Sequence, residues 1–242
     1  MNTRLPEVAV IAGVGPGLGA SLARRFVKEG CRVALLARSS DSLGALADEF
    51  RRHGQEVLAI PTDIGEPDQV TAAFERIREQ LGSVDLLINN ASAGGPFGQP
   101  FLEITPSSFA LGWQVGVLGS FLCSQAVVPD MLNKGSGWIL FTGATSSVRG
   151  AAITFSSAKF ALRGLAQALA RELWPKSIHV AHIIIDGVIQ ENEFGTGTEA
   201  QSMEPLMNPA AIANVYWDLV KQDRSAWTLE LDLRPDREKF FE

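Results

Sequence analysis

The chain has 242 residues, 46% of them hydrophobic, and a formal net charge of −6. No obvious linker or low-complexity run divides it, which favours one large α/β domain over two small ones. Lysine and arginine residues are scattered and outnumbered by acidic residues. This charge pattern argues against nucleic acid or an anionic membrane as a partner.

Cysteine content and the N-terminus bear on the compartment. Cys31 and Cys123 are the two cysteines, and both lie in apolar surroundings, which predicts buried, reduced thiols. Met1–Pro6 lacks the apolar core of a signal peptide, and no uninterrupted apolar run is long enough to span a bilayer. We therefore expect a cytoplasmic protein.

A glycine-rich segment follows the first predicted strand. Val8–Ala12 is a short apolar run of the kind found in strands buried on both faces. The sequence Gly-Val-Gly-Pro-Gly-Leu-Gly comes next, and a helical pattern then continues to Gly30. Glycines let the backbone approach a pyrophosphate, and a helix N-terminus attracts its charge. The alternative is a tight turn, but the context predicts a dinucleotide site with Gly13, Gly17, Leu18 and Gly19 contacting the cofactor.

The end of the second predicted strand, Cys31–Ala37, bears on which dinucleotide binds. In dinucleotide folds an acidic residue at this place selects NAD by binding the ribose 2′-hydroxyl. Here the residue is Ala37, and Arg38 follows it. A guanidinium can pair with a 2′-phosphate. NADP(H) is therefore favoured over NAD(H), although Arg38 could also be an ordinary surface arginine.

Strands and helices alternate along the rest of the chain. The pattern predicts further strands at Glu56–Ile60, Val84–Ile88, Trp138–Thr142, Ile178–Ile185 and Ala226–Leu233, and helices at Ser42–Arg52, Gln69–Leu81, Pro106–Leu132, Ala158–Leu173 and Ala210–Val220. We therefore predict an α/β fold: a single Rossmann-type, doubly wound parallel sheet with helices on both faces, spanning residues 1–242. The polar stretch 187–209 shows no helical period and is expected to be a substrate loop or lid.

Phe155 and Lys159 stand four residues apart at the start of the amphipathic run Ala158–Leu173, so on a helix they share a face. With the glycine spacing Gly-x-x-x-Gly-x-Gly and the Asn-Asn-Ala-Ser at 89–92, the chain resembles the short-chain dehydrogenase/reductase family over nearly its whole length. The family motif at 155–159 is Tyr-x-x-x-Lys. This chain keeps the lysine and has phenylalanine in place of the tyrosine.

The resemblance implies roles for several residues. Asp63 and Ile64 would lie at the adenine, Asn90 would line the cofactor site, and Lys159 would bind the nicotinamide ribose. Gly187 belongs to an Asp-Gly that replaces the family's usual Pro-Gly. A turn or helix-capping role for Asp63 is equally compatible with the sequence.

The family's other proton-transfer residues are also replaced. Ala144 occupies the serine place and Gly116 the asparagine place, so only Lys159 of the four is kept. We consider Thr145 and Ser146 the substitute catalytic hydroxyls, with Thr142, Ser156 and Ser157 as further candidates. The one tyrosine, Tyr216, is interpreted as a packing residue. His179 and His182 are interpreted as buried strand residues, and no cluster has metal-ligand spacing.

Three hypotheses follow from these residues. The first is an atypical NADP(H)-dependent oxidoreductase that acts on a small carbonyl, alcohol or activated double bond with a proton source other than tyrosine. The second is a catalytically silent homologue that binds nucleotide or a partner protein. The third is a scaffold that no longer binds nucleotide. Long apolar helices favour a homodimer or homotetramer.

Overall fold

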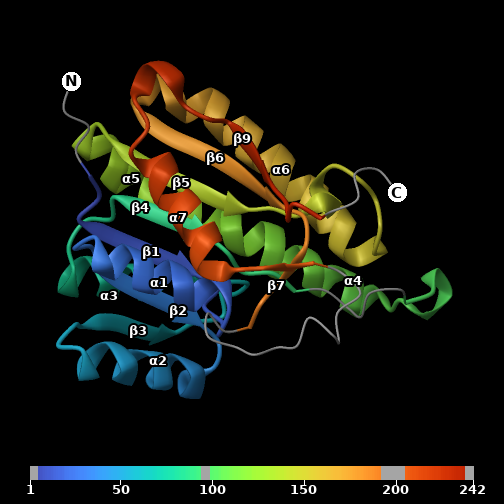
Figure 1. Cartoon of the computed structure of the whole chain (residues 1–242), viewed down its shortest axis with the longest axis horizontal. Coiled ribbons are helices and arrows are strands. Elements are labelled where there is room, and N and C mark those ends of the chain that lie inside the picture. The colour runs from blue at the N-terminus through green and yellow to red at the C-terminus, as the bar shows by residue number, and fades with distance from the viewer. Residues whose placement is uncertain (1–4, 94–98, 192–204, 238–242) are drawn as a thin grey trace.

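The computed structural model describes residues 5–93, 99–191 and 205–237. Its main sheet has seven parallel strands in the order β3-β2-β1-β4-β5-β6-β9 (Figure 1). The strands are β1 Val8–Ala12, β2 Arg32–Ala37, β3 Val57–Pro61, β4 Leu86–Asn89, β5 Gly137–Thr142, β6 Ile178–Ile185 and β9 Glu230–Leu233. The predicted doubly wound α/β fold is confirmed.

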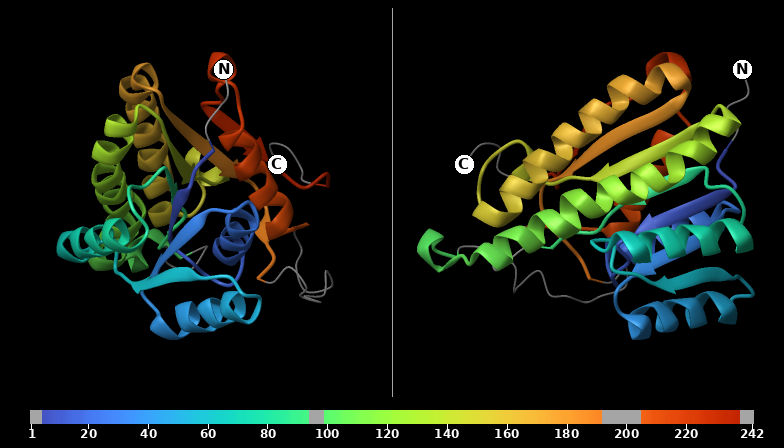
Figure 2. Two further views of the ribbon diagram at one scale, coloured as in Figure 1. Left: turned by 90° about the vertical axis from the view of Figure 1, so that its left-hand side faces the viewer. Right: turned by 180° about the vertical axis from the view of Figure 1, so that it is seen from behind.

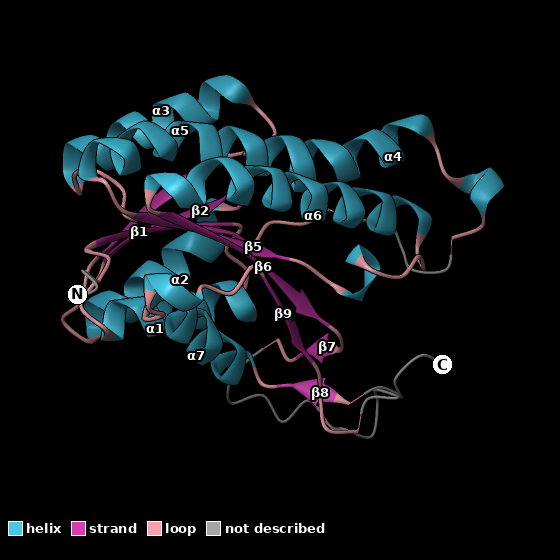
Figure 3. Ribbon diagram, turned by 90° about the horizontal axis from the view of Figure 1, so that it is seen from above, coloured by secondary structure: helices cyan, strands magenta, loops and turns pink. Residues whose placement is uncertain are grey.

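Helices cover both faces of the sheet (Figure 3). The described helices are α1 Leu18–Lys28, α2 Ser40–Arg52, α3 Pro67–Gln80, α4 Pro106–Trp113, α5 Gly119–Lys134, α6 Ile153–Leu173 and α7 Pro209–Val220. One apolar core lies between the sheet and α1, α2 and α7, and a second lies between the sheet and α3, α5 and α6. The two rotated views in Figure 2 show the same three-layer arrangement.

The alternation of side chains in β1 explains why its sequence is apolar throughout. Ala9 and Ile11 belong to one core, whereas Val8, Val10 and Ala12 belong to the other. Successive residues of a strand point to opposite faces, so a central strand with a core on each side has no polar position. β1 therefore begins and ends at the residues that the apolar run predicted.

The predicted helix Pro106–Leu132 is interrupted in its backbone pattern. α4 ends at Trp113, one turn of π-helix spans Gln114–Leu118, and α5 continues to Lys134. Among the described residues, this is the one helical stretch whose length and hydropathy would suffice to cross a membrane. Its α5 part packs on β4, β5 and α3, so it is a core helix of the domain.

The stretch 187–209 is only partly described, and part of it is structured. β7 Val188–Ile189 pairs in parallel with β8 Leu206–Met207. These two strands were not predicted in the stretch, for which the sequence analysis noted only that it shows no helical period. Two-residue strands are too short to produce a recognisable alternation. Residues 192–204, where most of the expected lid falls, lie outside the described residues.

The last strand is shorter than predicted. Residues 224–226 form a short 3₁₀ turn capped by the Asp223 side chain, and β9 begins only at Glu230. Between them, Trp227 stacks on His179 with ring centroids 4.7 Å apart. Trp227 therefore packs against a residue of β6, while the Leu229 carbonyl oxygen already accepts the His182 amide of β6 at 2.9 Å.

Candidate functional site

A cavity of about 750 Å³ opens at the carboxyl ends of β1, β2, β3 and β4. The order of strands reverses between β1 and β4, and ligands of open α/β sheets bind at such a switch point. Of the predicted cofactor residues, those that line the cavity are Gly13, Arg38, Asp63, Ile64 and Asn90. The cavity is also lined by residues that were not predicted to contact the cofactor, although Ala37 had been noted for its lack of a carboxylate. They are Val14, Gly15, Leu36, Ala37, Ser39, Thr62, Ala91, Ser92 and Val115.

Gly13 begins the turn between β1 and α1 and needs to be glycine. Its φ is +100°, and a Cβ atom there would lie 2.3 Å from the backbone nitrogen of Ala91. Both the Gly13 and Val14 amides donate to the Leu36 carbonyl oxygen, at 2.9 and 3.1 Å. The turn is thereby fixed against the ends of both neighbouring strands.

Gly17 and Gly19 serve close packing around the start of α1. Gly17 is the N-cap of the helix, and a Cβ atom there would lie 3.0 Å from the Gln190 carbonyl oxygen. A Cβ atom at Gly19 would lie 2.8 Å from Cα of Val14. Gly17, Leu18 and Gly19 do not line the 750 Å³ cavity, but they begin the helix whose N-terminus adjoins it.

Arg38 lies at the cavity rim with an exposed side chain. No ion pair to Arg38 occurs within residues 5–93, 99–191 and 205–237. Its guanidinium is therefore available to an anion that enters the cavity. Ser39, which also lines the cavity, caps α2 by accepting the Ser42 amide at 3.2 Å.

Asp63 combines a turn role with a place in the cavity wall. Its Oδ1 accepts the Gly65 amide at 3.0 Å, while its own amide donates to Gln69. The N-cap of α3 is Glu66, so the predicted helix-capping alternative is wrong and the turn alternative is right. Because a carboxylate has two oxygens, this turn leaves Asp63 capacity for a ligand.

Lys159 lies on α6, next to the end of β5. Its side chain is buried, and Nζ donates to the carbonyl oxygen of Thr142 at 2.7 Å. Nζ lies 5.4 Å from the centroid of the Phe155 ring, so the two residues share a helix face as predicted. Burial lowers the pKa of Lys159 to about 8. An amine with this pKa exchanges protons readily near neutral pH.

The hydroxyl candidates around Lys159 differ in whether they form hydrogen bonds. Ser156 Oγ accepts the Ala151 amide, and Ser157 Oγ donates to the Thr154 carbonyl oxygen. Thr142 Oγ1 is bonded to Asn90 and Tyr216. Thr145 Oγ1, by contrast, is buried and makes no hydrogen bond within the described part of the chain.

Ala144 and Gly116, which stand at the positions of the family's serine and asparagine, carry no titratable group. The Ala144 amide donates to Ser147 Oγ at 3.2 Å in the short turn Thr145–Ser147, which also contains the buried Ser146. Gly116 lies in the π-helical turn, and its carbonyl oxygen accepts the Ser120 hydroxyl at 2.9 Å. Gly187 follows β6, beside Met207 and Pro235. Its neighbour Asp186 is ion-paired with Arg234.

His182 is buried on β6 as predicted. Its Nδ1 contacts Glu230 Oε2 at 3.1 Å, and Arg163 holds the same carboxylate through two hydrogen bonds. Burial lowers the pKa of His182 to about 4. No metal-binding group of three or more His, Cys, Asp or Glu residues occurs within the described ranges.

Comparison with known proteins identifies the family. The short chain dehydrogenase family model matches residues 7–193. This chain belongs to the short-chain dehydrogenase family. Two curated relatives are the mouse 3-ketodihydrosphingosine reductase, 33% identical over 178 residues, and the Escherichia coli 7alpha-hydroxysteroid dehydrogenase, 30% identical over 193 residues. The alignments cover 71% and 78% of this chain, and 53% and 74% of those proteins. The chain thus spans about half the length of the mouse relative.

Solved structures agree over nearly the whole chain. A short-chain dehydrogenase from Rhodopseudomonas palustris is 35% identical with a TM-score of 0.77, covering 94% of this chain and 98% of that one. A metagenomic short-chain oxidoreductase in complex with NADP is 26% identical with a TM-score of 0.81, covering 96% and 98%. A Brucella melitensis 3-ketoacyl-(acyl-carrier-protein) reductase complexed with NADH is 27% identical with a TM-score of 0.82, covering 94% and 96%.

Proposed function

We propose that this protein is an NAD(P)-dependent oxidoreductase that interconverts a small carbonyl compound and its alcohol, or reduces an activated double bond. The observation that carries the proposal is the 750 Å³ cavity at the switch point of the sheet. Its wall combines the backbone of a glycine turn with a carboxylate, an amide and a guanidinium. A cavity of this size and chemistry suits a dinucleotide.

NADP(H) is the favoured cofactor. Ala37 places no carboxylate at the end of β2, and Arg38 extends from the next position into the cavity wall. A 2′-phosphate on the adenosine ribose would find a guanidinium there and no repelling charge. In this proposal Gly17, Leu18 and Gly19 hold the pyrophosphate at the start of α1, Asp63 and Ile64 contact the adenine, and Gly187 lies near the nicotinamide.

Lys159 is the proton source in this proposal. Bound NADPH supplies the hydride that forms the new C–H bond of the product. Lys159 gives a proton from Nζ to the substrate oxygen, and the resulting amine regains a proton from water. One of its three N–H donors is occupied by the Thr142 carbonyl oxygen, which leaves two for the substrate and the ribose. The unbonded hydroxyl of Thr145 and the nearby Ser146 supply hydrogen bonds to the same oxygen.

The test is NADPH oxidation measured with a panel of ketones, aldehydes and activated alkenes. Phe155→Ala should retain activity, because its ring carries no proton to transfer, whereas Lys159→Ala should lose it. Lys176→Ala, which removes an exposed lysine paired with Glu172, is the matched control and should retain activity. Equal activity in Phe155→Ala and Lys159→Ala would refute Lys159 as the proton source.

A catalytically silent, nucleotide-binding or partner-binding homologue is the second candidate. It is favoured by the absence of a titratable group or free hydroxyl at Phe155, Ala144 and Gly116. This candidate predicts tight NADPH binding without turnover of any compound in the panel. The first candidate predicts turnover.

Exposed apolar side chains on several helices bear on self-association. Apolar side chains remain exposed on α4, the π-helical turn, α5 and α6, namely Phe109, Leu111, Trp113, Leu118, Phe121, Leu132, Ile153 and Phe160. Such a surface suits a second copy of the chain, giving a homodimer or homotetramer. Sedimentation of the wild type and Phe121→Glu tests this, since the glutamate should shift the protein toward monomer.

The cellular location that we propose is the cytoplasm. The two buried, unpaired cysteines suit this location.

A further inference from the structure

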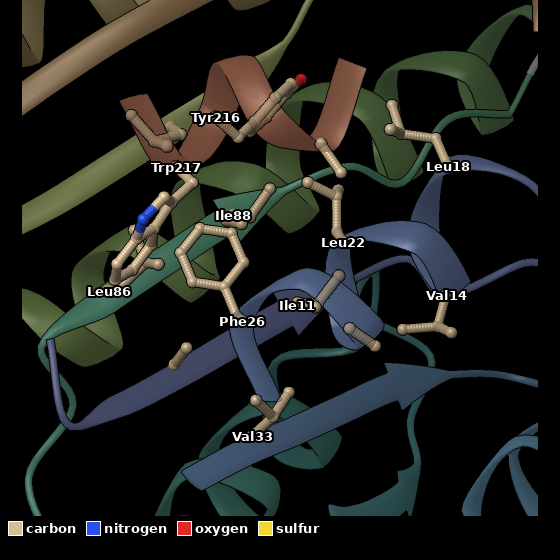
Figure 4. Close-up of a cluster of buried hydrophobic side chains, with 14 of the residues drawn as sticks. Ile11, Val14, Leu18, Leu22, Phe26, Val33, Leu86, Ile88, Tyr216 and Trp217 are labelled. Carbon is tan, nitrogen blue, oxygen red and sulfur yellow. The ribbon is translucent and has the colours of Figure 1, made fainter. Parts of the chain in front are cut away.

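Tyr216 is fully buried on α7, and its hydroxyl is not isolated there. Figure 4 shows its ring among apolar side chains of β1, α1 and β4. The hydroxyl oxygen lies 2.8 Å from Thr142 Oγ1 at the end of β5. A phenylalanine would fill the same apolar space without burying a polar group, so the hydroxyl requires an explanation of its own.

The hydrogen bond between Asn90 and Gly13 determines which groups donate and which accept around Thr142. Asn90 Nδ2 donates to the Gly13 carbonyl oxygen at 2.7 Å, which leaves Asn90 Oδ1 as an acceptor. Thr142 Oγ1 donates its one proton to that Oδ1 at 3.0 Å. Tyr216 must therefore be the donor to Thr142. Burial raises the pKa of Tyr216, so its hydroxyl keeps this proton at neutral pH.

Three hydrogen bonds thus run in one direction, from Tyr216 through Thr142 and Asn90 to the Gly13 carbonyl oxygen. Bonds aligned in this way polarise one another. At their end, the peptide between Gly13 and Val14 is held on both sides. Its carbonyl accepts from Asn90, and its amide donates to the Leu36 carbonyl oxygen at 3.1 Å.

We propose that Tyr216 and Thr142 are positioning residues for the nucleotide-binding turn. They act through Asn90, whose side chain both lines the cavity and holds the Gly13 carbonyl oxygen. The main chain of Thr142 also accepts from Lys159 Nζ, so the same residue connects the turn and the lysine. The proposal rests on the proposed function in one respect, namely that the ligand of this cavity is a dinucleotide.

The test compares Tyr216→Phe, Thr142→Val and the double variant with the wild type. Each substitution removes a hydroxyl and keeps the size of the side chain. Ser124→Ala is the matched control, because it removes a buried, hydrogen-bonded hydroxyl of α5 that takes no part in these bonds. The readouts are the Kd for NADPH from tryptophan fluorescence and the hydrogen exchange rate of the Val14 amide in the free protein.

Tyr216→Phe should weaken NADPH binding by about three- to tenfold, as expected for one lost buried hydrogen bond, and Thr142→Val by at least as much. The double variant should bind NADPH no more weakly than Thr142→Val does, because both substitutions interrupt the same series of hydrogen bonds from Tyr216 to Gly13. Val14 amide exchange should accelerate in all three variants and stay unchanged in Ser124→Ala.

Lowered thermal stability, with Kd and Val14 exchange both as in the wild type, would overturn the proposal and make Tyr216 a packing residue only. If the wild type binds no NADPH, the proposed function fails. The exchange rate of the Val14 amide still decides the positioning role in that case, and unchanged exchange in Tyr216→Phe and Thr142→Val refutes it.

Discussion

The ammonium of Lys159 lies 5.4 Å from the centre of the Phe155 ring and 2.7 Å from the carbonyl oxygen of Thr142. The first neighbour contributes only the negative face of an aromatic ring, and the second is an acceptor without a proton. Lys159 is thus a buried cation that forms no ion pair with a carboxylate within residues 5–93, 99–191 and 205–237. Its lowered pKa follows from this burial.

Phe155→Tyr should increase the rate of NADPH-dependent carbonyl reduction. A phenol at this place would gain an acidic proton beside Lys159, and a positioned acid contributes about 10²–10⁴-fold. We expect kcat to rise at least about tenfold, measured by absorbance of NADPH. Phe160→Tyr, on an exposed position of the same helix, is the control and should leave kcat unchanged. A Phe155→Tyr variant no faster than the wild type would show that position 155 does not face the reacting oxygen.

Lys159→Met should abolish turnover and stabilise the fold at pH 7. The unfolded lysine has a pKa near 10.5 and the folded one about 8. Between these values the unfolded state binds more protons, so wild-type stability should rise with pH by roughly 2–3 kcal/mol across this window. Urea unfolding at pH 7 and pH 10 measures this difference. Lys159→Met should lack the rise, whereas Lys176→Met should keep it. An equal slope in wild type and Lys159→Met would contradict the burial of a charged amine.

Arg38→Ala should change cofactor preference more than overall affinity. Loss of a charge-assisted contact to the 2′-phosphate should weaken NADPH binding about tenfold or more. NADH lacks this phosphate, so its Kd should stay within about twofold. Arg52→Ala on the exposed side of α2 serves as the control for loss of a positive charge. If Arg38→Ala weakens the binding of NADPH and NADH equally, the guanidinium does not bind the 2′-phosphate.

The stability of the protein should fall between pH 6.5 and pH 4 because of His182. Burial holds its pKa at about 4 in the folded state, against 6.5 when unfolded. Below pH 6.5 the unfolded state therefore binds the proton first, and unfolding becomes easier as pH falls. His182→Gln does not titrate and should flatten this part of the stability curve, measured by urea unfolding. His53→Gln, at an exposed position, is the control and should leave the pH dependence of stability as in the wild type. If the curve of His182→Gln is also unchanged, His182 is not the group that causes the loss of stability in acid.

The fold could be predicted where burial determines the residue pattern. β1 and β6 have the predicted bounds because both are covered by a core on each face. The π-helical turn Gln114–Leu118 could not be predicted, because one extra residue in a turn barely disturbs the apolar period of a long helix. β7 and β8 were missed because each has only two residues.

The candidate site likewise contains residues that the sequence could identify and contacts that it could not. Gly13 and Lys159 could be identified because glycine spacing and the four-residue interval to Phe155 are local features of the sequence. The bond between Thr142 and Tyr216 joins residues 74 positions apart and leaves no local signal. Tyr216 was interpreted from sequence as a packing residue, and its ring does pack in the core, but the hydrogen bond between its hydroxyl and Thr142 became visible only in the structure.

The most direct measurement is a titration of the purified protein with NADPH and NADH, followed by tryptophan fluorescence and energy transfer to the nicotinamide. We expect saturable binding of both, with NADPH the tighter ligand. Binding should be lost in Gly17→Asp, where even a Cβ atom would lie 3.0 Å from the Gln190 carbonyl oxygen and the carboxylate would repel a pyrophosphate. Failure of the wild type to bind either nucleotide would contradict the account and direct the search toward a partner protein.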